Sequence, residues 1–107
     1  MENKSKVETF IGFAVRAGKF RSGANTLATV KKAFVILVCE SAADNTVKQA
    51  EKYGAKYRCK VFRTAGVTLS DLAHKDGIKI AAITDFSLGK AIMDSAQPIL
   101  TEISAEK

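Results

Sequence analysis

The chain has 107 residues, of which 47% are hydrophobic and 26% charged, and its 17 Lys and Arg against 11 Asp and Glu give a net charge of +6. This length corresponds to one ordinary domain of about 100–150 residues and excludes a two-domain enzyme with a closing cleft. The composition is that of a soluble globular chain and excludes wholesale disorder.

The N-terminal third predicts a helix, a short basic loop and the start of a second helix. Apolar residues recur at helical spacing and predict an amphipathic helix over residues 5–17, ended by Gly18. Within residues 19–26 a second helix is expected to begin, capped by Ser22 or Asn25. The apolar residues that carry these two helices are Val7, Phe10, Ile11 and Ala14, followed by Leu27, Val30 and Phe34.

The middle of the chain alternates strand and helix. The apolar, β-branched run at residues 34–38 predicts a strand buried on both faces, as in a parallel sheet. Ser41 and Asp44 resemble a capping box for a helix over residues 42–53, which Gly54 is expected to end. A short strand then follows at residues 60–63.

The C-terminal part continues the alternation. Thr68 or Ser70 is expected to cap a short helix that Gly77 stops, and residues 78–83 predict another buried strand. Thr84 and Asp85 lead into a last helix. Pro98 lacks an N–H group and crowds the preceding turn, so we expect a kink or break near residues 96–97.

This order predicts a single α/β domain over residues 1–107. We expect a three-layer α-β-α sandwich with a small mixed, largely parallel sheet of about four strands. The core is expected to contain Phe10, Ile11, Val35, Ile36, Leu37, Val61, Leu72, Ile80 and Ile83.

The longest apolar run also bears on the compartment. It has seven residues, at 33–39, whereas a membrane span needs about 20, and the charged N-terminus leads into no secretory signal. We therefore expect a cytoplasmic protein without a membrane partner. Cys39 and Cys59 form no CxxC pair, and we predict two free thiols at opposite ends of the sheet.

The positive charge is concentrated in the N-terminal part. Residues 1–63 carry a balance of +8, from 13 Lys and Arg minus 5 Asp and Glu, and residues 64–107 carry −2, from 4 minus 6. A basic half suits a polyanion such as nucleic acid, and it is equally compatible with basic residues on solvated helix faces.

Enzyme signatures are largely missing. The sequence has neither a phosphate loop of the G-x-x-x-x-G-K-[ST] type nor G-x-G-x-x-G. The single histidine, His74, is expected at the surface rather than as a general base. Glu40 and Asp85 both follow strands, where an acid and a base could act together, but helix-start roles are commoner. We predict no enzymatic activity, no metal and no cofactor.

The basic loop over residues 19–26 is the strongest candidate site. Gly23 permits close approach of another chain, and a helix N-terminus presents free N–H groups that suit phosphate. Lys19 and Arg21 add positive charge, while Asn25 and Thr26 can bond bases or phosphates. A plain helix start, in which Ser22 and Asn25 only cap the backbone, is the competing interpretation.

The string AVRAGKFRSGANT, at residues 14–26, resembles the first-helix and glycine-loop region of the kink-turn-binding ribosomal-protein superfamily. This group includes the archaeal large-subunit protein of the seven-Ae type, and its bacterial YlxQ-like branch fits best. Matches in register follow at residues 35–46, at 72–73 and at 81–85, with a last helix. The resemblance implies an α-β-α sandwich that binds kink-turn RNA.

The resemblance also implies individual roles. Gly23 corresponds to the glycine that lets the RNA approach, and Asn25 to the residue that reads sheared G·A pairs. Thr26 and Thr29 depart from the family, which often has Glu and Lys there. The helix that follows Gly23 and the loop at residues 76–79 are also shorter than in members of the family. Lys31 or Lys32 could replace the lost phosphate contact, and Gly77, Ile78 and Lys79 correspond to the loop that touches an extruded nucleotide.

The sequence therefore predicts a small ribosome-associated RNA-binding protein, expected to be monomeric, that recognises kink-turn-like or bulged RNA. Ribosomal proteins are further candidate partners. The alternative is a protein-interaction adaptor on the same fold. The predicted RNA contacts are Lys19, Arg21, Ser22, Gly23, Asn25, Thr26, Thr29, Lys31, Lys32, Gly77, Ile78 and Lys79.

Overall fold

The computed structural model describes residues 2–96 and 99–103. In this part of the chain, five helices and five strands alternate almost regularly. In chain order they are α1 (Glu2–Arg16), β1 (Phe20–Ser22), α2 (Ala24–Leu27), β2 (Val35–Val38), α3 (Asp44–Tyr57), β3 (Lys60–Thr64), α4 (Leu69–Ala73), β4 (Ile80–Ile83), α5 (Phe86–Asp94) and β5 (Leu100–Glu102).

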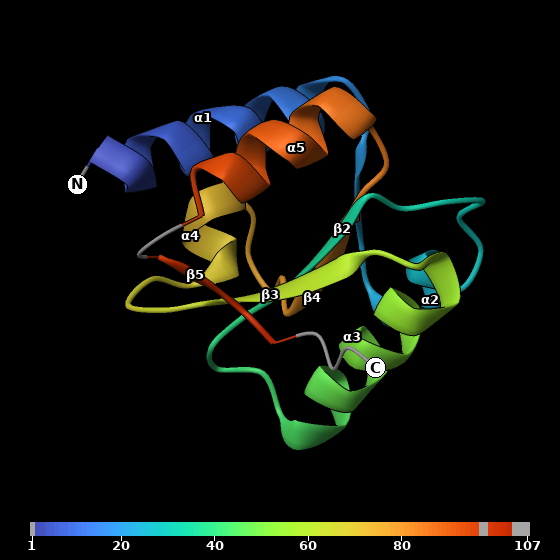
Figure 1. The fold of residues 1–107 in the computed structure, drawn as a ribbon. Helices are drawn as coiled ribbons and strands as arrows, with labels where there is room; N and C mark the ends of the chain where they lie inside the picture. The colour runs from blue at the N-terminus through green and yellow to red at the C-terminus, as the bar shows by residue number, and fades with distance from the viewer. Residues whose placement is uncertain (1, 97–98, 104–107) are drawn as a thin grey trace.

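The elements form three layers, as the sequence predicted. The strands make one sheet in the order β1-β4-β2-β3-β5. Helices α1, α4 and α5 pack together over one face, and α2 and α3 cover the other (Figure 1).

The sheet is mixed, but the expectation that it is largely parallel was wrong. Only β2 and β3 run parallel, with Val35 opposite Lys60, whereas β1 with β4, β2 with β4 and β3 with β5 are antiparallel. The lengths of the connecting helices explain this result. The 14 residues of α3 span about 21 Å and carry the chain back to the end of the sheet where β2 begins, so β3 runs parallel to β2. The five residues of α4 span only about 7.5 Å, so β4 enters at the end where β3 leaves.

The core lies around the two central strands. All four residues of β2 and all four of β4 are buried, which confirms the prediction that these strands are covered on both faces. The predicted core residues are buried, with the exception of Phe10, which is partly buried against the core. Phe10 lies at the edge of the apolar face of α1, whereas Ile11 and Val7 on the same helix are fully buried.

Several predicted helix boundaries are confirmed. Gly18 follows α1 with φ +75°. The Thr68 hydroxyl accepts a hydrogen bond from the N–H of Asp71 and caps α4, and an Asp85 carboxylate oxygen accepts one from the N–H of Leu88 and caps α5.

Other boundaries were wrong. The cap of α3 is Ala43, without a side-chain hydrogen bond, so the capping box at Ser41 does not form. Gly54 lies inside α3, packed on Val61, because the helix continues to Tyr57 and ends at Arg58 in the left-handed region. Helix α4 ends at Ala73, and Gly77 belongs to the turn that follows.

The second predicted helix is a single turn. Helix α2 stops at Leu27, and the chain continues as an irregular loop over residues 28–34, hereafter the 28–34 loop. Thr26, Thr29 and Val30 are β-branched residues with a weak helix preference. Neither β1 nor β5 was expected, since each has only three residues. Helix α5 ends at Asp94, two residues before Ala96, and of the residues 96–97 where a kink or break was expected, Gln97 lies outside the described residues.

Candidate nucleic-acid interface

The candidate loop is anchored as an edge strand. In β1, Arg21 is exposed, while Phe20 and Ser22 are partly buried and Phe20 packs against the core. The N–H of Gly23 donates to the carbonyl oxygen of Ile80 (3.1 Å), and the N–H of Thr84 donates to that of Lys19 (2.9 Å). Both ends of the loop are therefore fixed to β4, and Gly23 takes φ +93°, a conformation that favours glycine.

This pairing brings the two predicted segments together. Ser22 and Gly23 line a hollow of about 270 Å³ with Gly77, Ile78 and Lys79, and Thr46 and Gln49 of α3 complete its wall. We call it the glycine hollow. Ile78 is only 8% exposed and belongs to the core, so its side chain does not project as the apolar contact that was expected of it.

A second hollow gathers most of the remaining candidates. Arg21, Thr26, Thr29, Lys31 and Lys32 line about 360 Å³, together with Val30 and Thr84. We call it the basic hollow. Lys19 and Asn25 line neither hollow, and both are exposed. Ten of the twelve predicted residues therefore divide between the two hollows, five in the lining of each.

The charges around these hollows are available to an anion. Within the described residues, the ion pairs are Lys60 with Glu102, His74 with Glu8 and Lys90 with Asp94. None of them uses a predicted RNA contact, and neither hollow has an acidic residue in its lining. Lys79 donates to the Ser41 hydroxyl oxygen (2.8 Å), and the Lys32 ammonium lies 5.8 Å from the centre of the Phe34 ring.

The N-terminus of α2 contributes less to the attraction of phosphate than the sequence predicted. Helix α2 contains four residues, and a single turn sums few peptide dipoles. The chemistry of this surface therefore rests on side-chain charge, on hydroxyl and amide groups, and on the close approach that Gly23 permits.

The carboxylates considered for catalysis do not meet. Asp85 follows β4 and Glu40 follows β2, and these strands are antiparallel, so the two residues lie at opposite ends of the sheet. Asp85 caps α5, and a Glu40 carboxylate oxygen accepts a hydrogen bond from the N–H of Gly66 (2.8 Å). His74 is exposed, as predicted. Among the described residues, no three His, Cys, Asp or Glu side chains gather as metal ligands.

The two thiols are free and lie at opposite ends of the β2–β3 pair, as predicted. Burial raises the pKa of the Cys59 thiol to about 11. Burial acts in the same direction on Cys39, but hydrogen bonds with Ser41 and with the N–H of Leu69, and the charge of Lys79, lower its pKa overall.

Sequence reasoning missed a third concavity, the largest of those described. It measures about 780 Å³ and lies between α3, α5 and the start of β3. Phe34, Tyr57, Arg58 and Met93 are among its lining residues, and Lys32 lines both this groove and the basic hollow. No sequence signal could have found it, because its walls come from four separate segments.

Comparisons with known proteins identify the fold only. No family model and no curated protein matches the chain. A solved structure of a protein with unknown function from Bacillus halodurans is similar, with a TM-score of 0.73 and 16% sequence identity over 84% of this chain and 95% of that one. Across the described residues, no helix is long and apolar enough to cross a membrane.

Proposed function

We propose that this chain is a small RNA-binding protein that grips kinked or bulged RNA through the glycine hollow and the basic hollow. The observation that carries the proposal is that ten of the twelve predicted contacts line these two hollows, without an acidic residue in either lining. The cations Arg21, Lys31, Lys32 and Lys79 around them hold no ion pair in the described part of the chain.

Irregular RNA suits such a surface. Proteins recognise RNA mostly where bases are splayed out of regular helices, and a sharp bend brings phosphates close together. The cations would contact phosphates and make binding salt-dependent, while Asn25 and the threonines of α2 would meet base edges. The resemblance of residues 14–26 to the kink-turn-binding superfamily supports the same assignment and a cytoplasmic, ribosome-associated role.

The chain departs from that family at a position where a lysine contacts phosphate, so another residue must supply this contact. Thr29 stands where a lysine is common, and Lys31 and Lys32 line the same hollow as Thr29. We propose that these two lysines take over the phosphate contact. Because they follow α2 rather than belong to it, the contact would come from the 28–34 loop.

The test is a titration of the protein against a kink-turn RNA and a straight duplex of equal length, at two salt concentrations. We expect tighter binding of the kinked RNA that persists at the higher salt. Asn25→Ala should reduce binding of the kinked RNA selectively, whereas Lys90→Ala, on the opposite face of the sheet, should change neither. Equal and salt-sensitive binding of both RNAs would contradict the proposal.

Such a result would favour a protein-interaction adaptor. Two large apolar side chains support that second candidate, since Phe86 is 62% exposed on α5 and Phe13 is 46% exposed on α1. Because α1 and α5 pack together, both belong to one helical layer. Isolated exposed aromatics are common, so their presence carries less weight than the two hollows.

A further inference from the structure

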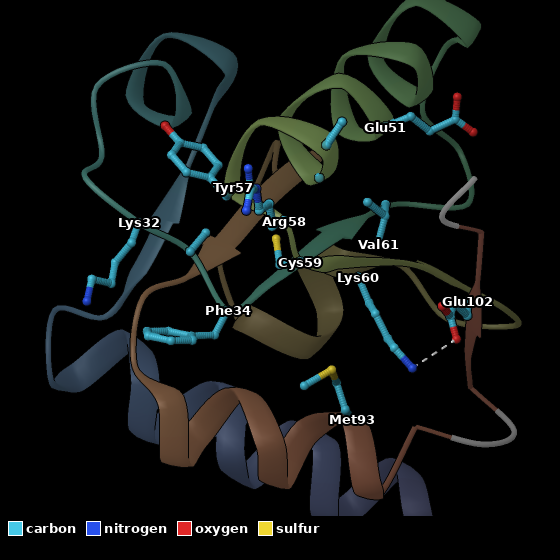
Figure 2. A pocket seen from close by; sticks show the side chains of 13 residues that line it. Lys32, Phe34, Glu51, Tyr57, Arg58, Cys59, Lys60, Val61, Met93 and Glu102 are labelled. Carbon is cyan, nitrogen blue, oxygen red and sulfur yellow. Dashed lines mark ion pairs between the residues drawn. The ribbon is translucent and has the colours of Figure 1, made fainter. Parts of the chain in front are cut away.

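The large groove between α3 and α5 has the features of a nucleobase site. Figure 2 shows Phe34, Met93, Lys60 and Val61 around an open space, with Arg58 above it at the end of α3. Its volume of about 780 Å³ lies within the range of about 300–1,000 Å³ that is usual for small-molecule sites. Side chains of Phe34, Val61 and Met93 give it apolar walls.

The aromatic wall is held in place before any ligand arrives. The Phe34 ring meets the ring of Phe86 edge to face, with centroids 5.7 Å apart. Gly89 of α5 leaves room for Phe34, because an added Cβ at Gly89 would lie 3.1 Å from the Cβ of Phe34. A preset aromatic side chain loses little conformational freedom when a flat ring packs against it.

The groove is lined by charges of both signs, namely Glu51 and Glu102 beside Lys32, Arg58 and Lys60. Lys32 and Arg58 are exposed and hold no ion pair among the described residues, whereas Lys60 is paired with Glu102 at 3.7 Å. Apolar walls next to free cations suit an aromatic ring that carries a phosphate, and a nucleotide has this composition.

The backbone of Arg58 makes this residue suitable for substitution by glycine. Arg58 ends α3 with φ +57°, a left-handed conformation in which glycine is usual and other residues are strained. Glycine at this position would cap the helix with less strain but would remove the guanidinium group.

The groove adjoins the proposed RNA surface. Lys32 is exposed and lines both the groove and the basic hollow. We propose that the groove takes an unpaired base of the RNA bound at the two hollows, with the base against Phe34 and Met93 and its phosphate between Lys32 and Arg58. This inference rests on the proposed function. An apolar peptide would fill the walls but would leave the cations at the rim without a role.

The test uses three probes: a blunt kink-turn RNA, the same RNA with a short single-stranded extension, and the single strand alone. Stacking of one base on an aromatic side chain stabilises bound single strands, so the extension should tighten binding about tenfold. The ε-methyl NMR signal of Met93 should shift with the extended RNA and stay in place with the blunt one. The chain has two methionines, so this signal can be assigned with Met93→Leu.

Arg58→Gly is the decisive variant, because it removes the cation and relieves the left-handed strain, so folding is preserved. It should abolish the gain from the extension and leave binding of the blunt RNA unchanged. His74→Gly is the matched control, since His74 ends α4 with the same φ of +57° and lies outside the groove lining. The His74→Gly variant should bind the extended RNA more tightly than the blunt RNA by the same factor as the wild type.

The outcomes separate the two proposals. If the blunt RNA binds but the extension adds nothing and Met93 does not shift, the groove inference is overturned and the proposed function stands. If neither kinked RNA binds but the single strand shifts Met93, the groove's ligand class is supported and the kinked target is overturned. A shift produced by a leucine-rich peptide and by none of the RNAs would overturn the groove inference.

Discussion

The hydroxyl oxygen of Tyr57 lies 2.6 Å from the backbone carbonyl oxygen of Leu27 and 2.9 Å from that of Val30. A single O–H proton serves these two acceptors. The contact joins the end of α3 to the 28–34 loop, whose residues Thr29, Lys31 and Lys32 line the basic hollow. The position of the loop cations therefore depends on the side chain of Tyr57, which lies 27 residues beyond Val30 in the sequence.

Replacing this tyrosine tests that dependence. Tyr57→Phe keeps the ring and removes the hydroxyl, so we expect a loss of about 0.5–1.5 kcal/mol in the free energy of unfolding. Affinity for the kinked RNA should fall as well, because the loop loses its anchor. Urea unfolding and RNA titration of the same preparation would measure both quantities. Unchanged values in both would show that the hydroxyl does not hold the loop.

Two helical glycines should respond to alanine in opposite directions. At Gly54, an added Cβ would overlap the buried Val61 side chain and lie 3.2 Å from the carbonyl oxygen of Cys59. Overpacking of this kind outweighs the helix preference of alanine, so Gly54→Ala should lose about 1–2 kcal/mol. At Gly12 the nearest such atom is the flexible end of Arg16, at 3.6 Å, and Gly12→Ala should gain about 0.5–1 kcal/mol. Denaturant unfolding of the two variants would reveal the difference, and equal shifts would contradict it.

Stability should fall in alkali because of Cys59. Its thiol has an ordinary pKa of 9.0 that burial raises to about 11 in the folded protein. Between these values the folded state binds more protons than the unfolded state, so the free energy of unfolding decreases as pH rises through this window. The difference between wild type and Cys59→Ala, measured at about pH 7 and about pH 10, isolates this contribution. Wild type should lose more stability than the variant over that interval, and parallel losses would argue against a shifted thiol.

The proposed phosphate contact of Arg21 has a salt signature. Arg21→Ala should weaken kinked and straight RNA alike and lower the slope of log affinity against log salt by about one. Lys90→Ala removes a cation that is already paired with Asp94, on the face covered by α1, α4 and α5, and should leave the slope unchanged. Binding measured over a salt series would distinguish the two variants. The same loss of slope in both would point to general attraction by net charge rather than to a contact.

The candidate site was predictable in part. Glycine and basic residues indicated the segment 19–26, and the family resemblance added residues 77–79. The structure places Ser22 and Gly23 beside Gly77 and Lys79. Thr46 and Gln49 were missed because nothing local indicates which face of α3 turns toward Gly23. The length of α2 was also missed, since the 28–34 loop is held from outside by Tyr57.

The sequence by itself determined which residues are buried and where most elements lie, because burial of β2 and β4 follows from local apolar runs and the caps at Thr68 and Asp85 from local hydrogen bonds. Only the tertiary structure decided the direction of β4, the pairing of the edge strands β1 and β5, and the groove beside Phe34. These features depend on how far each connection carries the chain and on contacts between segments distant in sequence, and no local pattern encodes either.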